Sequence, residues 1–149
     1  MTPLWTPSPE RIAATRMDAF RRKVAQQHGL DLPDYAALHA WSIAEREAFW
    51  LAIVDSFAVQ FHEAPTAVLE EGPEMPDARW FPGATLNFAE HLLRRRDHQP
   101  ALIAISEDER REVLSHAELA AQVAGLQRAL REAGVGVGDR VAAFMPNTW

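Results

Sequence analysis

The first third of the chain carries hydrophobic residues at helical spacing. Ser8 is a suitable N-cap, Pro9 suits the first helical position, and Gly29 is a suitable stop. The apolar residues between them that fall near one face are Ile12, Met17, Phe20 and Val24. The pattern predicts one continuous amphipathic helix that begins at Pro9 and ends before Gly29.

Two further helical patterns follow. The stretch "PDYAALHAW" predicts a short helix with Asp34 as its N-cap. The stretch "SIAEREAFWLAIVDSFAVQFH", residues 42–62, opens with Ser42 and Glu45 at capping-box spacing and predicts a long helix. Its apolar stripe, which we interpret as a core or domain-packing face, consists of Trp50, Ile53, Val54, Phe57 and Phe61.

The periodicity stops between residues 64 and 82. Prolines and glycines interrupt "EAPTAVLEEGPEMPDARWFPGATLNF" and predict a long irregular connection. Such a loop is unusual inside a compact domain, so we expect it to dock onto another body, with Trp80 and Phe81 as its anchors. Asn87 then predicts the cap of a helix "FAEHLLRRR", whose final arginines suit the negative end of the helix dipole.

Strand-like runs appear after residue 100. The runs "ALIAIS" (101–106) and "EVLS" (112–115) predict two strands, and the charged stretch "EDERR" between them predicts a hairpin turn. Ser115 and Glu118 form a second capping-box pair, and Gly134 is placed to end the helix that follows. The apolar stripe of that helix consists of Leu119, Val123, Leu126 and Leu130.

Three glycines at alternate positions, Gly134, Gly136 and Gly138, raise the question of a phosphate-binding loop. Such a loop follows a strand and opens a helix, so that free N–H groups point at the anion. Here the glycines follow a helix, whose end presents carbonyl groups that repel phosphate. We therefore interpret them as a helix stop and a tight turn into Asp139.

The run "RVAAFM", residues 140–145, is apolar almost throughout. This is typical of an interior strand in a parallel sheet that is covered on both faces. The order strand, helix, strand indicates a mixed α/β fold, but the other elements of the chain cannot flank and cover this last strand. We therefore expect the chain to be the front part of a larger domain.

Composition narrows the function classes. The formal net charge of −6, with scattered basic residues, argues against a nucleic-acid surface. The lack of cysteine excludes disulfides, thiolate catalysis and zinc–sulfur sites and favours a cytoplasmic setting. Lys23 is the only lysine. The N-terminus lacks a signal-peptide core, and no apolar run approaches the roughly 18 residues that span a bilayer, so we expect no membrane partner.

Three stretches resemble a known family. "VLSHAELAAQVAGLQRALREAGVGVGDRVAAFMPN" resembles the early segment of the adenylate-forming superfamily, which includes acyl-CoA synthetases, with His116 where the family has a tyrosine. "WFPGATLNFAEHLL" resembles the acetyl-CoA synthetase branch. The opening "PLWTPSPERIAATRMDAF" is similar to the branch that activates acetoacetate. The resemblance covers essentially the whole chain.

The resemblance implies a reaction and a division of the chain. ATP and a carboxylate, here acetoacetate, give an acyl-adenylate, and CoA then displaces AMP to form a thioester, with magnesium accompanying the ATP. Residues 1–98 would form a helical N-terminal cap with its docking segment, and residues 99–149 would start the AMP-binding α/β domain, with the remainder of that domain as partner. The family's phosphate loop, magnesium-binding segment and catalytic lysine match no part of this chain. We therefore assign no catalytic, cofactor-binding or metal-binding residue here and expect the chain alone to be inactive and to bind no cofactor.

Other polar clusters have plainer interpretations. His62-Glu63 and Glu90-His91 lack the i, i+4 histidine pair of a helical zinc site. Glu70-Glu71 and Glu107-Asp108-Glu109 lie in predicted turns, where water solvates them, and general acid–base work needs a shifted carboxyl. Arg94–Arg96 fit a solvated helix end. The remaining histidines are interpreted as surface or cap residues: His28, His39, His98 and His116.

Two alternatives stay open at this point. The acid could be acetate, propionate or another short acid, because substrate choice depends on pocket residues outside this chain. The chain could also be a non-catalytic helical module that binds a partner through the aromatic stripe of residues 42–62.

Overall fold

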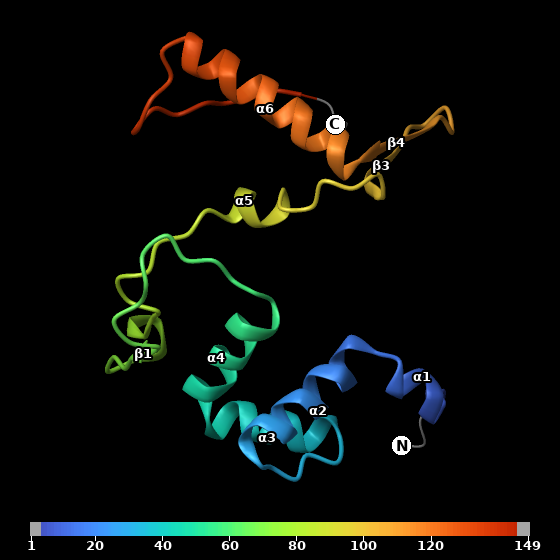
Figure 1. Cartoon of the computed structure of the whole chain (residues 1–149), viewed down its shortest axis with the longest axis vertical. Helices are drawn as coiled ribbons and strands as arrows, with labels where there is room; N and C mark the ends of the chain where they lie inside the picture. Colours follow the sequence, from blue (N-terminus) through green and yellow to red (C-terminus); the bar gives the residue numbers. More distant parts are fainter. Residues whose placement is uncertain (1–3, 146–149) are drawn as a thin grey trace. The chain divides into compact units, whose positions relative to one another are not determined.

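The computed structural model describes residues 4–145, and its contacts divide the chain into two compact units, Met1–Leu86 and Asn87–Trp149. We describe each unit by itself; Figure 1 gives the labels and colours of their elements. Helices predominate, and the strands form two small antiparallel pairs. This mixed content agrees with the predicted fold class.

The first unit begins with two helices where the sequence predicted one. They are α1 (Pro9–Ala13) and α2 (Arg16–His28). The prediction of one helix was wrong because Thr15 starts a new one: its hydroxyl donates to the Ile12 carbonyl at 2.8 Å and accepts from the Asp18 N–H at 3.1 Å. Ser8 caps α1, and Gly29 ends α2 with φ 63°, as predicted.

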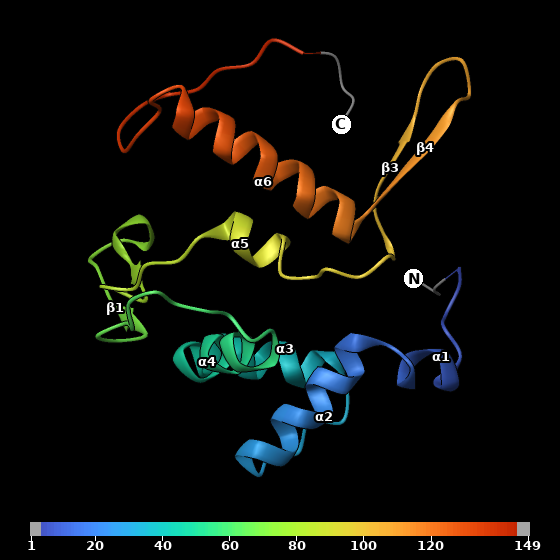
Figure 2. The ribbon, with the colours of Figure 1, turned by 45° about the horizontal axis from the view of Figure 1, so that its top comes forward.

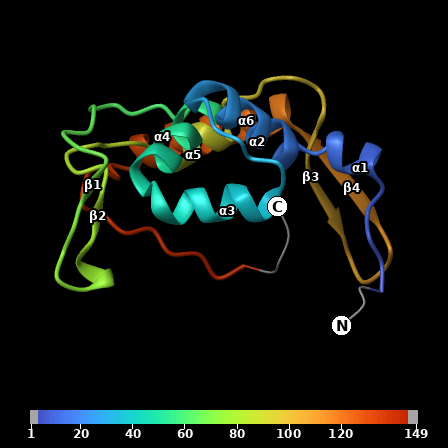
Figure 3. The same ribbon diagram turned by 90° about the horizontal axis from the view of Figure 1, so that it is seen from below.

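The next pair of helices also divides at an unpredicted place. Asp34 caps α3 (Tyr35–Ala44) as expected, but α3 continues through Ser42, and α4 (Arg46–Ser56) begins only after Glu45. The Ser42 hydroxyl donates to the His39 carbonyl at 2.8 Å inside the helix, so the predicted capping box with Glu45 does not form. Figure 3 shows α3 and α4 as two separate segments joined by a bend.

Helix α4 is shorter than predicted. It ends at Ser56, and the turn that follows places Ala58 in the left-handed region with φ 48°. Phe61 therefore lies outside the helix, where its ring contacts Phe81 at a centroid distance of 5.6 Å. The predicted aromatic stripe is consequently divided between α4 and the segment after it.

The irregular connection contains a small ordered ladder. Strands β1 (Leu69–Glu70) and β2 (Arg79–Trp80) pair antiparallel on either side of a 3-10 turn, η1 (Met75–Asp77). Further backbone bonds continue this pairing from Phe81 to Val68 and from His62 to Thr85. The segment is thus less irregular than the prolines suggested, because paired backbone groups on its two sides satisfy one another.

The core of the first unit is small and helical. Its buried apolar residues are Val24, Leu32, Leu38 and Ala52, with Phe20, Leu30 and Trp41 packed against them. They come from α2, α3, α4 and the loop before α3. The core therefore packs together helices whose mutual contacts the sequence pattern does not predict. Burying each large apolar side chain contributes about 1.5–3 kcal/mol before entropy is subtracted.

The second unit contains the predicted hairpin. Asn87 caps α5 (Phe88–Leu92), which is shorter than predicted. Strands β3 (Pro100–Ile105) and β4 (Arg111–Ser115) pair antiparallel, with Leu102 opposite Leu114. Helix α6 (His116–Glu132) follows at once, and Figure 2 shows that hairpin and helix meet at this junction and diverge from it.

Both ends of α6 are as the sequence predicts. Ser115 and Glu118 form the reciprocal capping box. At the other end Gly134 takes φ 84°, and the N–H groups of Gly134 and Val135 donate to Arg131 and Leu130, both at 3.0 Å. The Asp139 carboxylate accepts from the Gly136 N–H at 2.8 Å, which confirms the turn interpretation of the glycines.

The predicted strand at residues 140–145 is not formed. The structure assigns these residues to no strand, and all six are exposed. An interior strand needs a partner on each edge and cover on both faces, whereas the described strands form only two separate two-stranded pairs, neither of which includes this segment. Among the described residues, no helix has the length and apolar character needed to cross a membrane.

Candidate functional site

An apolar groove lies between α2, α3 and α4. It encloses about 350 Å³, and its apolar lining includes Met17, Phe20, Tyr35, Leu38, Phe49 and Phe57. Met17, Tyr35 and Phe57 are more than half exposed, so the groove is open to solvent. Its main chemical property is a surface for apolar packing, because most of its lining is hydrocarbon or aromatic and Arg16, His39, Ser42 and the Tyr35 hydroxyl supply its polar groups.

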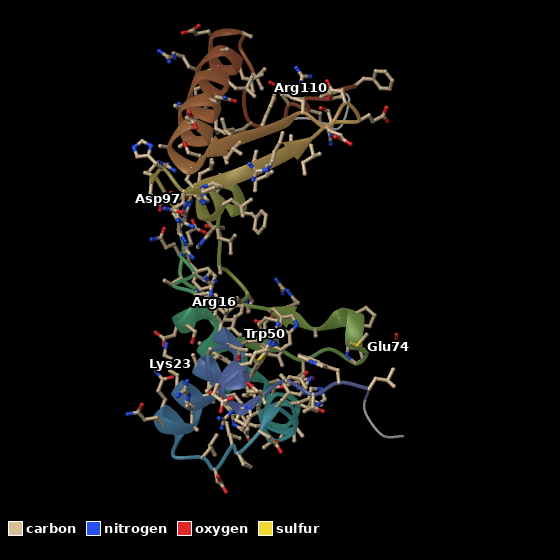
Figure 4. The ribbon with its side chains drawn as sticks, turned by 90° about the vertical axis from the view of Figure 1, so that its right-hand side faces the viewer. Arg16, Lys23, Trp50, Glu74, Asp97 and Arg110 are labelled. Carbon is tan, nitrogen blue, oxygen red and sulfur yellow. The ribbon has the colours of Figure 1, made fainter. Side chains whose placement is uncertain are left out.

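Trp50 of α4 does not line this groove but lies beside the irregular segment. Its ring lies 5.6 Å from that of Trp80 in β2, and Arg46 at the start of α4 forms an ion pair with Glu71. Trp50 is labelled in Figure 4. Trp80 and Phe81 thus both contact residues of their own unit, and their expected packing on a larger domain stays a prediction.

A charge cluster that the sequence analysis missed fixes α2. Asp18 is only 8% exposed and accepts from Arg21 at 2.6 Å and from Arg22 at 3.1 Å. Arg21 also donates to the Leu32 carbonyl and so ties α2 to the loop before α3. The i+3 and i+4 spacing of these arginines was the available signal. The cluster has a structural role because its charges satisfy one another.

Ion pairs also occupy the candidate carboxylate Glu70 and the carboxylate of Asp55 in α4. Glu70 pairs with Arg79 across β1 and β2 at 3.3 Å, and Lys23 pairs with Asp55 at 2.7 Å. Lys23, labelled in Figure 4, also lies 3.2 Å from the Ser56 hydroxyl, so it links α2 to α4. Neither pair leaves a carboxylate poised for proton transfer.

The resolved shifts in carboxyl pKa all run downward among the described residues. Hydrogen bonds that stabilise the charged form lower the pKa of Glu10, Asp55, Asp97, Asp108 and Glu118. For Asp108 the main donor is the Ser106 hydroxyl, in the hairpin turn where Arg110 also lies (Figure 4). A general acid needs the opposite shift, so the hairpin cluster carries no sign of acid catalysis.

The basic cluster after α5 forms local contacts. Arg95 pairs with Asp97 at 2.8 Å just after the end of α5, and Arg96 donates to the Arg95 carbonyl at 3.1 Å. Within residues 4–145, the structure contains no group of three or more metal-ligating side chains. His62-Glu63 and Glu90-His91 are therefore not brought into a larger cluster.

The second unit also exposes apolar side chains. Leu114 is 6% exposed and is the only buried apolar residue that the structure describes there. By contrast Ile105, Leu126, Val141 and Phe144 are each more than 60% exposed. What both units offer is packing surface, so the arrangement fits a part that supports a larger body.

Comparisons with known proteins agree with this picture. The family described as "Acetyl-coenzyme A synthetase N-terminus" matches residues 35–92. An acetoacetyl-coenzyme A synthetase from Rhizobium meliloti is 45% identical over 97% of this chain and 22% of its own length. A malonamoyl-CoA synthetase from Penicillium aethiopicum is 33% identical over 97% of this chain and 21% of its own length.

A solved structure matches the fold itself. Acetoacetyl-CoA synthetase from Streptomyces lividans superposes with a TM-score of 0.88 at 44% identity, over 99% of this chain and 23% of that one. The fold and these matches define the class: the chain is homologous to the N-terminal part of adenylate-forming CoA ligases. Within that class its homologues at 44–45% identity are acetoacetyl-CoA synthetases, and the chain spans about a fifth of their length.

Proposed function

We propose that this chain is the N-terminal part of an ATP-dependent acetoacetate–CoA ligase. In the first half-reaction the acetoacetate carboxylate attacks the α-phosphorus of ATP, which forms acetoacetyl-AMP and releases diphosphate. In the second, the CoA thiol attacks the acyl carbon, which forms acetoacetyl-CoA and releases AMP. The observation that carries the proposal is 45% identity to an acetoacetyl-coenzyme A synthetase over 97% of the chain.

ATP, CoA and magnesium belong to the complete enzyme in this proposal. The described residues form neither a phosphate-binding loop nor a metal-ligating group, and the glycine turn after α6 presents the wrong end of a helix. Residues 1–98 supply the helical cap with its docking segment, and residues 99–149 start the AMP-binding domain. A cytoplasmic location, expected from the lack of cysteine, is part of the same proposal.

The chemistry of the relatives' substrates supports the choice of acid. The names of two relatives specify acetoacetyl and malonamoyl products. Both acids carry a second carbonyl two carbons from the carboxylate, which acetate and propionate lack. A short β-carbonyl acid is therefore favoured, and the greater identity to the acetoacetyl enzyme favours acetoacetate within this class.

The alternative of a non-catalytic binding module rests on the apolar groove between α2, α3 and α4. This groove encloses about 350 Å³ and leaves Phe57 52% exposed. A peptide helix with apolar residues at i, i+3 and i+4 would fit such a surface. This alternative requires a monodisperse monomer with a cooperative unfolding transition and no ligase activity in the complete protein.

The test is an assay of the polypeptide encoded by the whole reading frame that contains these residues. We expect acetoacetate-dependent release of diphosphate from ATP, with a higher kcat/KM than for acetate or propionate. The isolated 149-residue chain serves as the control and should release none. A preference for acetate would show that acetate, not acetoacetate, is the substrate. A lack of diphosphate release with every acid would contradict the proposal that the protein is a ligase.

A further inference from the structure

The apolar groove of the first unit carries one permanently charged side chain in its lining. The groove lies between α2, α3 and α4 and encloses about 350 Å³. Arg16, near the start of α2 and labelled in Figure 4, lines it, and no carboxylate belongs to the lining that the structure describes. Arg16 also lines a second hollow, between α2 and the end of α4, beside Phe20 and Phe57. A guanidinium therefore stands where two apolar depressions adjoin.

Arg16 differs from the other cations of the first unit because it has no partner. Within residues 4–145 its guanidinium forms neither an ion pair nor a hydrogen bond. The other cations of the unit each have a carboxylate or a ring as partner: Arg11 has Trp5, Arg21 and Arg22 share Asp18, Lys23 has Asp55, Arg46 has Glu71, and Arg79 has Glu70. Arg16 thus leaves one positive charge unneutralised beside an apolar groove.

The walls of the groove are apolar, and part of their surface is in water. Leu38 is buried, whereas Met17, Tyr35 and Phe57 are 53%, 61% and 52% exposed. The Ser42 hydroxyl already donates to the His39 carbonyl, so it does not need a ligand. A ligand with an aliphatic chain would remove the exposed apolar surface from water, which is favourable.

We propose that this groove binds an aliphatic carboxylic acid of medium chain length, with its chain between α2, α3 and α4 and its carboxylate on the Arg16 guanidinium. A guanidinium binds a carboxylate through two parallel N–H···O bonds. The volume lies at the lower end of the range of about 300–1,000 Å³ for small-molecule sites, which suits a single chain. The proposal goes beyond the ligase reaction and does not depend on it.

Other occupants match these observations less well. A second copy of the chain that met this one groove to groove would bring a second unpaired Arg16 to the same place, and the two like charges would repel. The formal net charge of −6 disfavours a headgroup with several negative charges relative to a single carboxylate. A peptide helix would cover the apolar walls, but it has a use for Arg16 only if it also carries an acidic residue at that position. A monocarboxylate with one apolar chain accounts for both features at once.

The experiment follows the methyl group of Met17 by NMR in the polypeptide encoded by the whole reading frame that contains these residues. Met17 lines the groove, whereas Met75, on the turn between β1 and β2, is 91% exposed and serves as the internal control. Titration with octanoate should shift the Met17 signal with saturation and leave Met75 unchanged. The signal comes from the groove, so octanoate bound elsewhere in the polypeptide does not contribute to it.

Chain length and charge are tested with related ligands. Affinity should rise about threefold per added methylene from hexanoate to decanoate, because each methylene buries more apolar surface, and should level off once the groove is filled. 1-Octanol has the same chain without the negative charge, so it should bind about fivefold more weakly than octanoate. This comparison tests the role of charge without any substitution in the protein.

Two variants assign the charge to Arg16. Arg16→Gln should weaken the binding of octanoate about fivefold and leave that of 1-octanol unchanged. Arg11→Gln is the matched control, because Arg11 lies over the Trp5 ring and outside the groove, and it should change neither affinity.

Several outcomes would overturn the proposal. They are a Met17 signal that octanoate does not shift, equal affinities for octanoate and 1-octanol, an Arg16→Gln variant that binds octanoate as the parent does, and binding that does not saturate. A Met17 signal that an acidic amphipathic peptide shifts and octanoate does not would assign the groove to a protein partner and overturn the proposal as well.

Discussion

At the scale of single residues, buried and exposed charges have different roles. Asp18 is 8% exposed and accepts from two arginines, whereas Asp55, which pairs with Lys23, has a side chain that is 62% exposed. A charge pair that loses one partner leaves the other uncompensated, and the cost grows with burial. Exposed pairs are screened by water and contribute little.

Asp18→Asn should therefore lower the free energy of unfolding of the first unit by about 2 kcal/mol, because Arg21 loses its charged partner in a partly buried site. Urea denaturation followed by tryptophan fluorescence measures this change. The matched control is Asp55→Asn, which removes an exposed pair and should give no measurable change. Equal effects of the two variants would contradict the structural role of the Asp18 cluster.

Glu118 gives a prediction about pH. The Ser115 hydroxyl and backbone N–H hold the pKa of Glu118 below its ordinary value of 4.5. The folded helix therefore gains stability from this capping box above about pH 4.5 and loses it as pH falls through the lower folded pKa. The helical circular dichroism of the chain should fall in that acid range.

The variant Glu118→Gln should flatten this acid dependence, because an amide does not titrate. Glu132→Gln, at the other end of α6, is the control and should keep the slope of the parent chain. NMR titration of the Glu118 carboxyl measures the pKa directly. A value at or above 4.5 in the folded chain would show that the capping box does not form in solution.

At the scale of elements, the caps decide where helices begin. The sequence predicts Asp34 and Ser42 as the N-caps of two successive helices. The structure confirms Asp34, which accepts from the Ala37 N–H at 2.9 Å, but it places Ser42 inside α3 and starts α4 after Glu45. Asp34→Ala should destabilise the first unit by about 1 kcal/mol. Ser42→Ala should be neutral or stabilise it by a few tenths, since alanine suits a helix interior better.

Chemical denaturation of the two variants distinguishes the two helix boundaries. A larger loss of stability from Ser42→Ala than from Asp34→Ala would restore the boundary at Ser42 and contradict the structure. The two variants are a matched pair, because both side chains are small and polar and lie close together in the sequence. They differ in the hydrogen bond that is lost. The Asp34 carboxylate accepts from a backbone N–H at the start of a helix, whereas the Ser42 hydroxyl donates to a carbonyl inside the helix.

The elements that the sequence predicted correctly are those with local signals. Ser115, Glu118 and Gly134 define both ends of α6 within a few residues, and the two strand-like runs on either side of the charged stretch 107–111 define the hairpin. The breaks at Thr15 and Glu45 were missed because alternative caps compete within a continuous apolar stripe. The small ladder of β1 and β2 was missed because two-residue strands carry no periodicity.

Of the features considered for a candidate site, the sequence predicted only the turn of glycines after α6. The placement of glycines after a helix excluded a phosphate loop from the sequence alone. The apolar groove and the contact of Trp50 with Trp80 depend on contacts between distant segments, which no local spacing encodes. The Asp18 cluster had a local signal, but its burial comes from the loop at Leu32.

At the scale of the whole molecule, the two units differ in core. The first buries Leu38 together with Val24, Leu32 and Ala52, whereas Leu114 is the only buried apolar residue described in the second. Helix α6 should therefore open at a lower free energy than α2 and α3, which native-state hydrogen exchange measures. Leu38→Ala should cost the first unit about 3 kcal/mol. Slower exchange in α6 than in α2 would contradict this ranking.

In the proposed function this chain is a structural front part of a ligase, and the rest of the polypeptide would perform the chemistry. The most direct measurement is acetoacetate-dependent diphosphate release by the Rhizobium meliloti relative carrying this chain in place of its own matching segment. We predict a rate within about tenfold of the parent enzyme, which corresponds to a change of at most about 1.4 kcal/mol in activation free energy. The parent enzyme lacking the segment should be far slower. A folded chimera no more active than the truncated enzyme would contradict the account.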